Sequence, residues 1–543
     1  MGRRKLRLLV VAAAAVLVLA SCGRAGQSAD PPNLIHGPLG SFLAKSTDLG
    51  PSHGHPVQLT VALHGSTRPQ RLIAWADAHR LSVRWRPGDN FAYVAGAPDD
   101  FALAFGVSVH DFRSADGQVF YASRQQPDVP AVVRSDVTSL GRILSYNPAH
   151  VVRPPLLPLD VPKGALTPSQ LLTTYNATPL NTTGKGQTIV FFEIDKFDQS
   201  DFDKFTAKFH LPQLKPTVLG DTPKDDVGET PMDLQVAHGI APDAKKVIIY
   251  LPNDNVPFQQ IYEDDAKAFE QADRQFPGAV WSLSLGDGCD MIDLPADLAP
   301  VQAAVAAAQR HGTTVFISSG DTGGYECKGY GIDGKDDFST PPTEEEIGLS
   351  SLASVPEVTD VGGTTLSTDD RGAWVTEAGW ADYPMTQGTG GGVSKLFARP
   401  DWQRGVTVAQ DITGNHPSVP DAATQRLTPD VAADADPATG ALFCYHGQGL
   451  PGGGTSQSAP IWAALATLMN QYLISHGGHA IGDLNRVLYP AAANGTRPAL
   501  HDVAFGGNAA YNSGDGFDLA TGLGTPNTIN LVEDILDIQK AGG

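Results

Sequence analysis

One stretch decides the fold: Gly452-Gly453-Gly454-Thr455-Ser456-Gln457-Ser458-Ala459-Pro460, followed at once by the apolar residues 461–469. Glycines allow a close approach of the backbone, and Pro460 is tolerated in the first turn of a helix, where its missing N–H would be unpaired anyway. The pattern predicts a buried helix with Ser456 on a tight turn at its N-terminus. Backbone N–H groups and the helix dipole there suit a nucleophile whose intermediate is an oxyanion. A Gly-rich loop with a Ser/Thr helix cap is the alternative interpretation.

The length and the charge of the chain narrow the class of protein. With 543 residues the chain is long enough for two or three domains. Hydrophobic residues make up 41% and charged residues 18%, as in an ordinary globular protein. The net charge of −21 argues against nucleic acid as a partner, because no basic face of the needed size is available.

Residues 1–22 have the pattern of a lipoprotein signal peptide. Basic residues at 3, 4, 5 and 7 precede the apolar residues 8–20, and Leu19-Ala20-Ser21-Cys22 resembles a bacterial lipobox. An ordinary signal peptide that happens to end in Cys is the alternative. No other stretch has the 18 or more apolar residues of a spanning helix. We therefore expect an exported protein, extracellular or at the cell surface, tethered to the membrane through lipidated Cys22.

Export permits disulfides, and three cysteines remain when Cys22 is set aside. Cys289 and Cys327 each follow a predicted strand, which makes them the better pair and leaves Cys444 without an internal partner. No Cys or His cluster has zinc spacing.

The region after the leader reads as a small separate domain over residues 31–150. Strands are predicted at 57–63, 81–85, 91–95 and 108–112, and helices at 68–80 and 99–105. The order βαββαβ is that of a ferredoxin-like α+β sandwich. Residues 151–167 contain four closely spaced prolines, which favour extended chain, so this segment is expected to be a linker with a processing site.

Residues 168–543 form the main domain. Apolar strands are predicted at 187–194, 247–251, 279–285 and 313–318, and helices at 200–209, 229–238, 259–276 and 296–311. Continuous apolar strands that alternate with helices indicate an α/β fold whose parallel sheet has helices on both faces. Ligands in such folds bind beyond the carboxyl ends of the strands.

Three carboxylates stand out in this domain. Glu229 and Asp233 are four residues apart at the start of a predicted helix, so they share one face and would titrate as a pair. Pro231 fixes this position as a first turn. Alternatively, these acidic residues merely complement the helix dipole. Asp321 lies in Ser318-Ser319-Gly320-Asp321-Thr322-Gly323-Gly324, directly after a strand, where an Asx-type turn is the simpler interpretation.

Together these motifs resemble those of the sedolisin (kumamolisin-like) serine-carboxyl peptidases. Gly228-Glu229-x-x-x-Asp233 is similar to the family's Glu/Asp pair, Ser319-Gly320-Asp321 to its oxyanion loop, and Gly454-Thr455-Ser456-x-Ser458-x-Pro460 to its nucleophile motif. Further similar stretches are Val361-Gly362-Gly363-Thr364, Gly390-Gly391-Gly392-Val393-Ser394, Pro400-x-Trp402-Gln403 and Pro429-Asp430-Val431-Ala432. The resemblance covers nearly everything after residue 166, and it implies a subtilisin-like fold preceded by an activation prodomain.

The resemblance also implies catalytic roles. Ser456 would attack the peptide carbonyl, and Glu229 would act as general base and later as acid. Asp233 would orient Glu229 and share its proton, while protonated Asp321 would donate to the oxyanion. A carboxyl base together with a carboxyl that must keep its proton indicates activity at acidic pH. The expected protein is a monomeric zymogen that cuts protein or peptide substrates and is inhibited by its own prodomain.

The sequence leaves alternatives open at this point. The protein could be an endopeptidase or a tripeptidyl-peptidase, an inactive member of the family, or a surface protein that only binds peptides. Glu193 matches a glutamate that extends the hydrogen-bond chain in some relatives, but Leu285 stands where those relatives have a tryptophan. The acidic stretch at residues 333–346 also departs from the family pattern.

The C-terminal region resembles the family's calcium loop. The resemblance implies one structural Ca²⁺ held by the carboxylates of Asp502 and Asp518 and the carbonyls of Val503, Gly514 and Gly516. An ordinary Gly/Asp turn is the alternative.

The charges of the two domains differ. The span 31–165 carries 12 Lys and Arg against 10 Asp and no Glu, whereas the rest of the mature chain is strongly acidic. Five arginines are predicted to dock the small domain electrostatically and to release it on acidification: Arg68, Arg71, Arg80, Arg84 and Arg86. Alternatively, they only solvate an exposed face.

Overall fold

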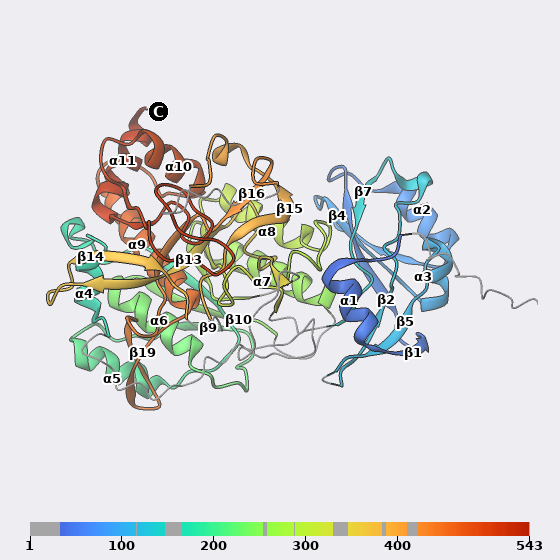
Figure 1. Cartoon of the computed structure of the whole chain (residues 1–543), viewed down its shortest axis with the longest axis horizontal. Coiled ribbons are helices and arrows are strands. Elements are labelled where there is room, and N and C mark those ends of the chain that lie inside the picture. Colours follow the sequence, from blue (N-terminus) through green and yellow to red (C-terminus); the bar gives the residue numbers. More distant parts are fainter. Residues whose placement is uncertain are drawn as a thin grey trace, which may run out of the picture.

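The computed structural model describes residues 33–115, 117–146, 165–252, 258–286, 288–328, 346–382, 387–409 and 421–541. The expected signal peptide and nearly all of the expected linker lie outside these ranges, as does the stretch 333–345. The chain forms a small N-terminal domain (residues 33–146) and a large C-terminal domain (residues 165–541), which lie side by side (Figure 1). No helix within the described ranges has the length and hydropathy that crossing a membrane requires.

The C-terminal domain is built on one large sheet. Its strands are, in spatial order, β14 (Trp374–Gly379), β13 (Thr359–Thr368), β12 (Thr314–Ser318), β11 (Val280–Leu283), β8 (Thr188–Glu193), β10 (Lys245–Tyr250) and β9 (Thr217–Leu219). All pair in parallel except β14, which is antiparallel to β13, and β17 (Val431–Asp434) also pairs with β13 in parallel. The predicted parallel α/β sheet is confirmed.

Both faces of this sheet are buried because neighbouring side chains of a strand point to opposite sides. In β8, Ile189 and Phe191 contribute to one hydrophobic core, and Val190 and Phe192 to the other. The first core includes residues of α4 (Pro168–Thr174), α6 (Glu229–Ile240), α9 (Thr455–Ser475), α10 (Asn485–Asn494) and α11 (Thr528–Ala541). The second includes residues of α7 (Phe258–Gln275) and α8 (Ala299–Arg310).

Helix α9 crosses the first face and is buried over most of its length, including Trp462 and Leu465 at 0% exposure. It begins at Thr455, so Pro460 is its sixth residue. The prediction that Pro460 lies in the first turn is therefore wrong, and Ser456 belongs to the helix itself. Pro231, by contrast, lies in the first turn of α6 as predicted.

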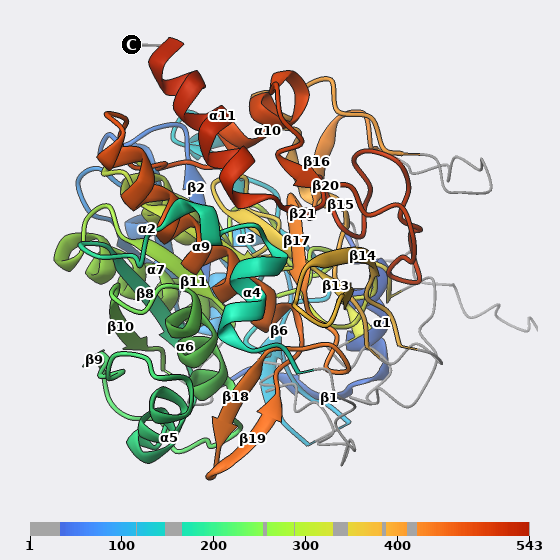
Figure 2. The same cartoon turned by 90° about the vertical axis from the view of Figure 1, so that its left-hand side faces the viewer.

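Figure 2 looks onto the side of the C-terminal domain that carries α4, α6 and α11. Helix α5 (Gln199–Phe209) packs there against the hairpin formed by β18 (Leu442–Tyr445) and β19 (Gln448–Pro451). The smaller elements of this domain are the pair β15 (Gly392–Ala398) and β16 (Gln425–Thr428), the pair β20 (Leu500–His501) and β21 (Thr525–Pro526), and the short helices η2 (Thr178–Leu180) and η5 (Asp401–Gln403).

The N-terminal domain contains two antiparallel sheets. One has the order β3 (Ser82–Arg84), β4 (Phe91–Gly96), β2 (Val57–Leu63), β7 (Val137–Leu140), with α2 (Gln70–Ala78) and α3 (Pro98–Phe105) between strands along the chain. The second has the order β1 (Thr47–Pro51), β5 (His110–Arg113), β6 (Val119–Ala122). Helix α1 (Gly37–Lys45) precedes them, and η1 (Ala131–Val133) precedes β7.

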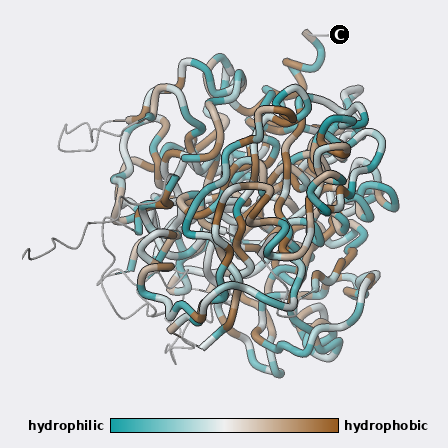
Figure 3. Tube along the Cα trace, turned by 90° about the vertical axis from the view of Figure 1, so that its right-hand side faces the viewer, coloured by the Kyte–Doolittle hydropathy of each residue, from teal (hydrophilic) through white to brown (hydrophobic). Residues whose placement is uncertain are grey.

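The last strand of the predicted βαββαβ unit needs a correction. The expected strand at 108–112 forms β5, which belongs to the second sheet, and β7 is the strand that joins β2. A hydrophobic pattern marks a strand but does not choose its partner, because pairing depends on contacts remote in sequence. Figure 3, which looks onto this domain, shows hydrophobic chain toward its middle and mostly hydrophilic chain around its edge.

The N-terminal domain packs against α7 and α8. Phe91 and Tyr93 of β4 form a small hydrophobic cluster with Ala299 of α8. Arg84 makes a bidentate ion pair with Glu263 at 2.5 and 2.7 Å, and Arg86 pairs with Glu270. The remaining predicted docking arginines are not seen in this role: Arg80 pairs with Asp100 of its own domain, and no ion pair is found for Arg68 or Arg71 among the described residues. Two of the five predicted arginines therefore touch the acidic domain.

A second contact involves the predicted disulfide, which is present between Cys289 and Cys327. The bridge packs into a cluster with the aromatic side chains of Phe42, Phe112 and Phe120 from the N-terminal domain. Cys444 is buried with a free thiol, as expected.

Candidate active site

The candidate residues converge at the carboxyl edge of the sheet. Glu193 ends β8, Ser284 follows β11, and Asp321 lies in the turn after β12. The N-termini of α6 and α9 reach the same place, since the two helices pack against each other and against the central strands. Segments far apart in sequence thus bring together the four predicted catalytic residues.

Ser456 and Glu229 are neighbours, and the Ser456 hydroxyl lies close enough to the Glu229 carboxyl to lower its pKa. Both side chains are partly exposed, so a substrate can reach them. Asp233, one helical turn after Glu229, is fully buried at 0% exposure. The reacting pair therefore opens to solvent while the carboxyl behind it is sealed from water.

The buried environment of these carboxyls favours their protonated forms. One oxygen each of Glu193, Glu229 and Asp233 is buried without a hydrogen-bond donor. A carboxylate accepts only, so such an oxygen is satisfied in contact with another carboxyl only when one of them is protonated. Glu193 and Asp195 face the pair from the end of β8, and their charges disfavour ionisation of Asp233.

Burial and neighbouring negative charges raise the pKa values of Glu229 and Asp233. Burial raises the pKa of Glu229 to about 8, while its hydrogen bond with the Ser456 hydroxyl lowers it. Burial and the charges of Glu193 and Glu229 raise the pKa of Asp233 well above its usual range. Because Asp233 is the more deeply buried of the two, it is the member that keeps a shared proton.

Asp321 lies against the nucleophile loop. Its Oδ1 accepts hydrogen bonds from the Thr455 N–H at 2.7 Å and from the Thr455 hydroxyl at 2.9 Å. Its Oδ2 lies against Gly454, where an added Cβ would collide with it. Burial raises the pKa of Asp321. With Oδ1 occupied as an acceptor, Oδ2 is the oxygen that can hold a proton for donation.

A further carboxyl supports this turn. Glu326 is buried, its Oε1 accepts the Thr322 N–H at 2.9 Å, and its carboxyl lies where a Cβ of Gly320 would be. Burial raises the pKa of Glu326 to about 8. Gly320 has φ +108°, so glycine is required there both for conformation and for space.

Sequence reasoning missed two residues that organise the site. Asp195 is fully buried and accepts the N–H groups of Val227, Gly228 and Thr230 at 3.1, 2.9 and 2.8 Å. It thereby caps α6, whose own N-cap residue is a glycine. Ser284 contacts Asp233 Oδ2 at 2.5 Å and the carbonyl oxygen of Ser456 at 3.1 Å. In the sequence, Ser284 falls within the strand predicted at 279–285, so its place beyond the end of β11 became visible only in the structure.

The extended hydrogen-bond chain depends on Glu193 and on the residue at position 285. Glu193 accepts the Thr230 hydroxyl at 2.9 Å. Leu285 is buried at 4% exposure within the second core and offers no hydrogen bond from its side chain.

Comparisons with known proteins bear on this arrangement. No family model matches the chain. Kumamolisin of Bacillus sp. (strain MN-32) is 29% identical over 509 residues, which cover 88% of this chain and 84% of the relative. Sedolisin of Pseudomonas sp. (strain 101) is 29% identical over 447 residues, 77% of this chain and 70% of the relative. Tripeptidyl-peptidase 1 of Bos taurus is 25% identical over 508 residues, 87% of this chain and 80% of the relative.

A solved structure of Pseudomonas sedolisin, a serine-carboxyl proteinase complexed with two molecules of pseudo-iodotyrostatin, superimposes with a TM-score of 0.55. It is 28% identical and covers 69% of this chain and 98% of its own. Over most of its length the chain is therefore similar to sedolisin, kumamolisin and tripeptidyl-peptidase 1. It is a serine-type peptidase with an α/β, subtilisin-like fold.

The segment that resembles the sedolisin calcium loop, residues 502–521, is held together by its own hydrogen bonds. Asp502 accepts the Gly516 N–H at 2.9 Å, and Asp518 accepts the N–H groups of Ala520 and Thr521 at 2.8 Å each. The Asp518 side chain is fully buried. The carbonyl oxygens of Val503, Gly514 and Gly516 accept no hydrogen bond from any residue that the structure describes. Two carboxylates and three free carbonyls on one loop are a donor set that suits calcium.

Cys289, Asp290 and Cys327 form a cluster of residue types that often bind metals, but the two cysteines cannot act as thiolate ligands. The sulfur atoms of Cys289 and Cys327 lie near Asp290, but they are joined in the disulfide and offer no thiolate.

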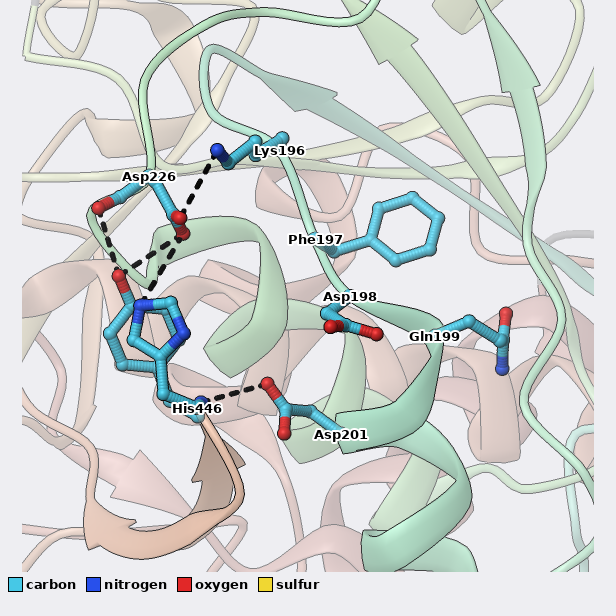
Figure 4. A pocket seen from close by; sticks show the side chains of 8 residues that line it. Lys196, Phe197, Asp198, Gln199, Asp201, Asp226 and His446 are labelled. Atoms are coloured by element: carbon cyan, nitrogen blue, oxygen red, sulfur yellow. Dashed lines mark hydrogen bonds and ion pairs between the residues drawn. The ribbon is translucent and has the colours of Figure 1, made fainter.

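A cavity of about 320 Å³ has a lining that includes none of the four candidate catalytic residues (Figure 4). Its lining comes from the loop into α5, from Asp226 and from the turn between β18 and β19. Asp226 pairs with Lys196 at 3.2 Å, and Asp201 accepts the His446 N–H at 2.8 Å. The charged groups of the cavity thus largely satisfy one another and support the loop into α6, where the ring of Tyr445 lies near Gly228.

Proposed function

We propose that the protein is an acid-acting serine-carboxyl peptidase, made as a zymogen, that hydrolyses peptide bonds through an acyl-enzyme on Ser456. The observation that carries the proposal is the position of Asp321, whose carboxyl contacts Gly454 and Thr455 directly before Ser456, while the Glu229 carboxyl lies beside the Ser456 hydroxyl. Nucleophile, base and oxyanion donor are the three groups that acyl transfer needs.

The proposed reaction follows from these positions. Ser456 Oγ attacks the carbonyl carbon of the scissile bond while its proton passes to the Glu229 carboxylate. The oxyanion of the tetrahedral intermediate accepts a hydrogen bond from the Asp321 carboxyl, whose free Oδ2 carries the proton. Glu229 then returns its proton to the leaving amine, and water, activated by the same carboxylate, releases the acyl group.

The protonation states set the working pH. Asp233 keeps the shared proton and leaves Glu229 as the base, and the Ser456 hydrogen bond stabilises that carboxylate. Asp321 must stay protonated, so activity falls as pH rises through its pKa. Activity also falls when acid protonates the pair completely. The Ser456 and Ser284 hydroxyls act against burial and lower the pKa of Glu229, which moves the acidic limb of the pH profile toward lower pH.

We also propose that the N-terminal domain is the activation prodomain and that residues 151–167 contain the processing site. The domain packs against α7, α8 and the Cys289–Cys327 bridge. Cys289 lies five residues after Ser284, and Cys327 lies six residues after Asp321. The domain is therefore attached beside two segments of the candidate active site, a place from which it can control access to the cleft.

Calcium is proposed as a structural ion. Asp502 and Asp518 would hold it with the carbonyls of Val503, Gly514 and Gly516, and water would complete the six to eight ligands that Ca²⁺ takes. The ion would neutralise the two carboxylates and link the turns of this loop.

Export and attachment through lipidated Cys22 are proposed from the leader, and the disulfide supports an oxidising compartment. Cells that express the Cys22→Ala variant should release the protein from the membrane fraction, whereas the wild type stays with it. Equal membrane retention of both proteins would contradict the anchor.

The function is tested with purified full-length protein and denatured protein substrate at about pH 4. The wild type is expected to cleave and Ser456→Ala is not. Ser458→Ala is the matched control, because Ser458 is buried on the same helix and bonds to the Ala433 carbonyl. If the wild type binds peptides without cutting them, the inactive binding protein is the better description. Substrates with a blocked N-terminus then distinguish an endopeptidase from a tripeptidyl-peptidase.

A further inference from the structure

Pro460 leaves one carbonyl of helix α9 without its usual partner. In an α-helix the N–H of residue i bonds to the carbonyl of residue i−4, so residue 460 would bond to the carbonyl of Ser456. Proline has no N–H, and Pro460 lies inside the helix rather than in its first turn. The backbone carbonyl of the nucleophile is thus free to accept a hydrogen bond from elsewhere.

The Ser284 hydroxyl supplies that bond. Its Oγ lies 3.1 Å from the Ser456 carbonyl oxygen and 2.5 Å from Asp233 Oδ2. Ser284 also lies close enough to the Glu229 carboxyl to lower its pKa. A hydroxyl has one proton to donate, and a carbonyl can only accept. When Ser284 donates to the carbonyl, the short contact with Asp233 requires that the proton of this second bond come from Asp233.

We propose that Ser284, oriented by the carbonyl that Pro460 leaves free, is a positioning residue that keeps the shared proton on Asp233 and leaves Glu229 as the base. The inference rests on the proposed function. It adds a reason why Asp233 holds the proton while Glu229 acts as the base. It also gives Pro460 a chemical purpose, since an ordinary residue at 460 would occupy the carbonyl and turn the Ser284 proton toward Asp233.

Three other carboxyls face the pair and contribute to its titration. Glu193 and Asp195 approach from the end of β8, and Asp321 from the turn after β12. All three remain in the variants considered below, so a change in pH dependence can be assigned to Ser284 and Pro460.

The expected direction of the change follows from the acceptor. In Ser284→Ala the neutral Asp233 carboxyl loses the acceptor for its proton, so Asp233 ionises more readily. A charged Asp233 then raises the pKa of Glu229. In Pro460→Ala the new N–H takes the Ser456 carbonyl, and Ser284 donates to Asp233 instead, which also favours its charged form. Both single variants should move the acidic limb of kcat/KM to higher pH, by roughly one pH unit.

The test is a double-mutant cycle on the full-length protein after activation, read as the pH profile of kcat/KM. The double variant should shift no further than either single variant, because both act on one hydrogen bond. Ser282→Ala and Pro490→Ala are matched controls: Ser282 is a buried serine of β11, two residues before Ser284, and Pro490 lies inside helix α10. Neither control should move the limb.

The inference would be overturned if the acidic limb of kcat/KM stayed at the same pH in both single variants. It would also be overturned if the two pH shifts added in the double variant. Those results would leave the peptidase assignment standing as long as Ser456→Ala is inactive. If the wild type itself shows no cleavage, the proposed function fails first, and the two failures can be told apart.

Discussion

Two groups of buried or half-buried carboxyls respond to their surroundings in opposite ways. In the candidate active site, Glu193, Glu229 and Asp233 face one another, and their pKa values are raised. At the contact between the domains, Glu263 faces Arg84, and its pKa is lowered although burial acts to raise it. The carboxyls of the candidate active site therefore favour the protonated form, whereas Glu263 favours the ionised form, because only Glu263 lies next to a guanidinium group.

The difference has a consequence for acidification. A carboxyl whose pKa is lowered in the docked state stabilises docking above its free pKa, and that contribution is lost as pH falls through the docked pKa. Glu263 therefore favours release of the N-terminal domain in acid. Asp297 accepts the backbone N–H of Arg142 at 3.0 Å, yet burial raises its pKa to about 6. Its contribution is present in acid and fades as pH rises, so it opposes release.

The largest expected effect is a loss of activity on substitution of an active-site carboxyl, with no such loss at the domain contact. Glu229→Gln should lower kcat/KM roughly 1,000-fold or more, because the amide cannot accept the Ser456 proton. Glu263→Gln, the control from the other group, should leave turnover by the processed enzyme unchanged. Full activity of Glu229→Gln in a steady-state assay would show that the base is another residue.

A smaller loss is expected at the oxyanion donor. Asp321→Asn keeps an N–H that can donate but loses the carboxyl proton, and removal of one oxyanion donor typically costs about 100- to 1,000-fold in kcat. The alkaline limb of kcat should also disappear, since an amide does not titrate. A limb that persists in this variant would assign it to a different group.

The domain contact is probed by its two arginines. Exposed ion pairs typically contribute less than about 1 kcal/mol, so Arg84→Gln with Arg86→Gln should raise the pH at which self-cleavage begins by roughly half a unit. Arg71→Gln with Arg80→Gln is the matched control, because the Arg80 pair lies within the N-terminal domain. Cleavage within residues 151–167 is followed by mass spectrometry from pH 7 to pH 3. A threshold that moves equally in both double variants would reject the electrostatic latch.

The smallest effect on activity is expected at the proposed calcium loop. Asp518→Ala should lower the melting temperature by several degrees and abolish any further decrease on addition of a chelator. Asp515→Ala, an exposed residue of the same loop, should keep the wild-type response to the chelator. An unchanged chelator effect in Asp518→Ala would place the ion elsewhere.

Much of the fold could be predicted from local pattern. The predicted helix at 229–238 is α6 (Glu229–Ile240), and the predicted strand at 313–318 is β12 (Thr314–Ser318). The predicted pair Cys289 and Cys327 is also confirmed, and its basis in the sequence is that each cysteine follows a predicted strand. Long apolar elements are readable in this way since burial dictates their composition.

The residues that support the site were less accessible to sequence reasoning. Asp195 caps helix α6, which begins 34 residues later in the sequence. The residues next to Asp195 in the sequence give no sign of this role. Arg84 and Arg86 could not be told from Arg71 and Arg80 by charge alone, because only the packing of the sheet on α7 decides which side faces Glu263 and Glu270.

By itself the sequence determined the parallel α/β sheet, the order of the motifs and the residue types of the site, since these depend on composition and local spacing. Only the tertiary structure decided that β7, rather than β5, completes the first sheet, and that Pro460 lies inside α9. It also decided that Ser284 reaches the carbonyl of Ser456. The physical reason is common to all three: a hydrogen-bond partner remote in sequence is chosen by how whole elements pack, and no local pattern records that choice.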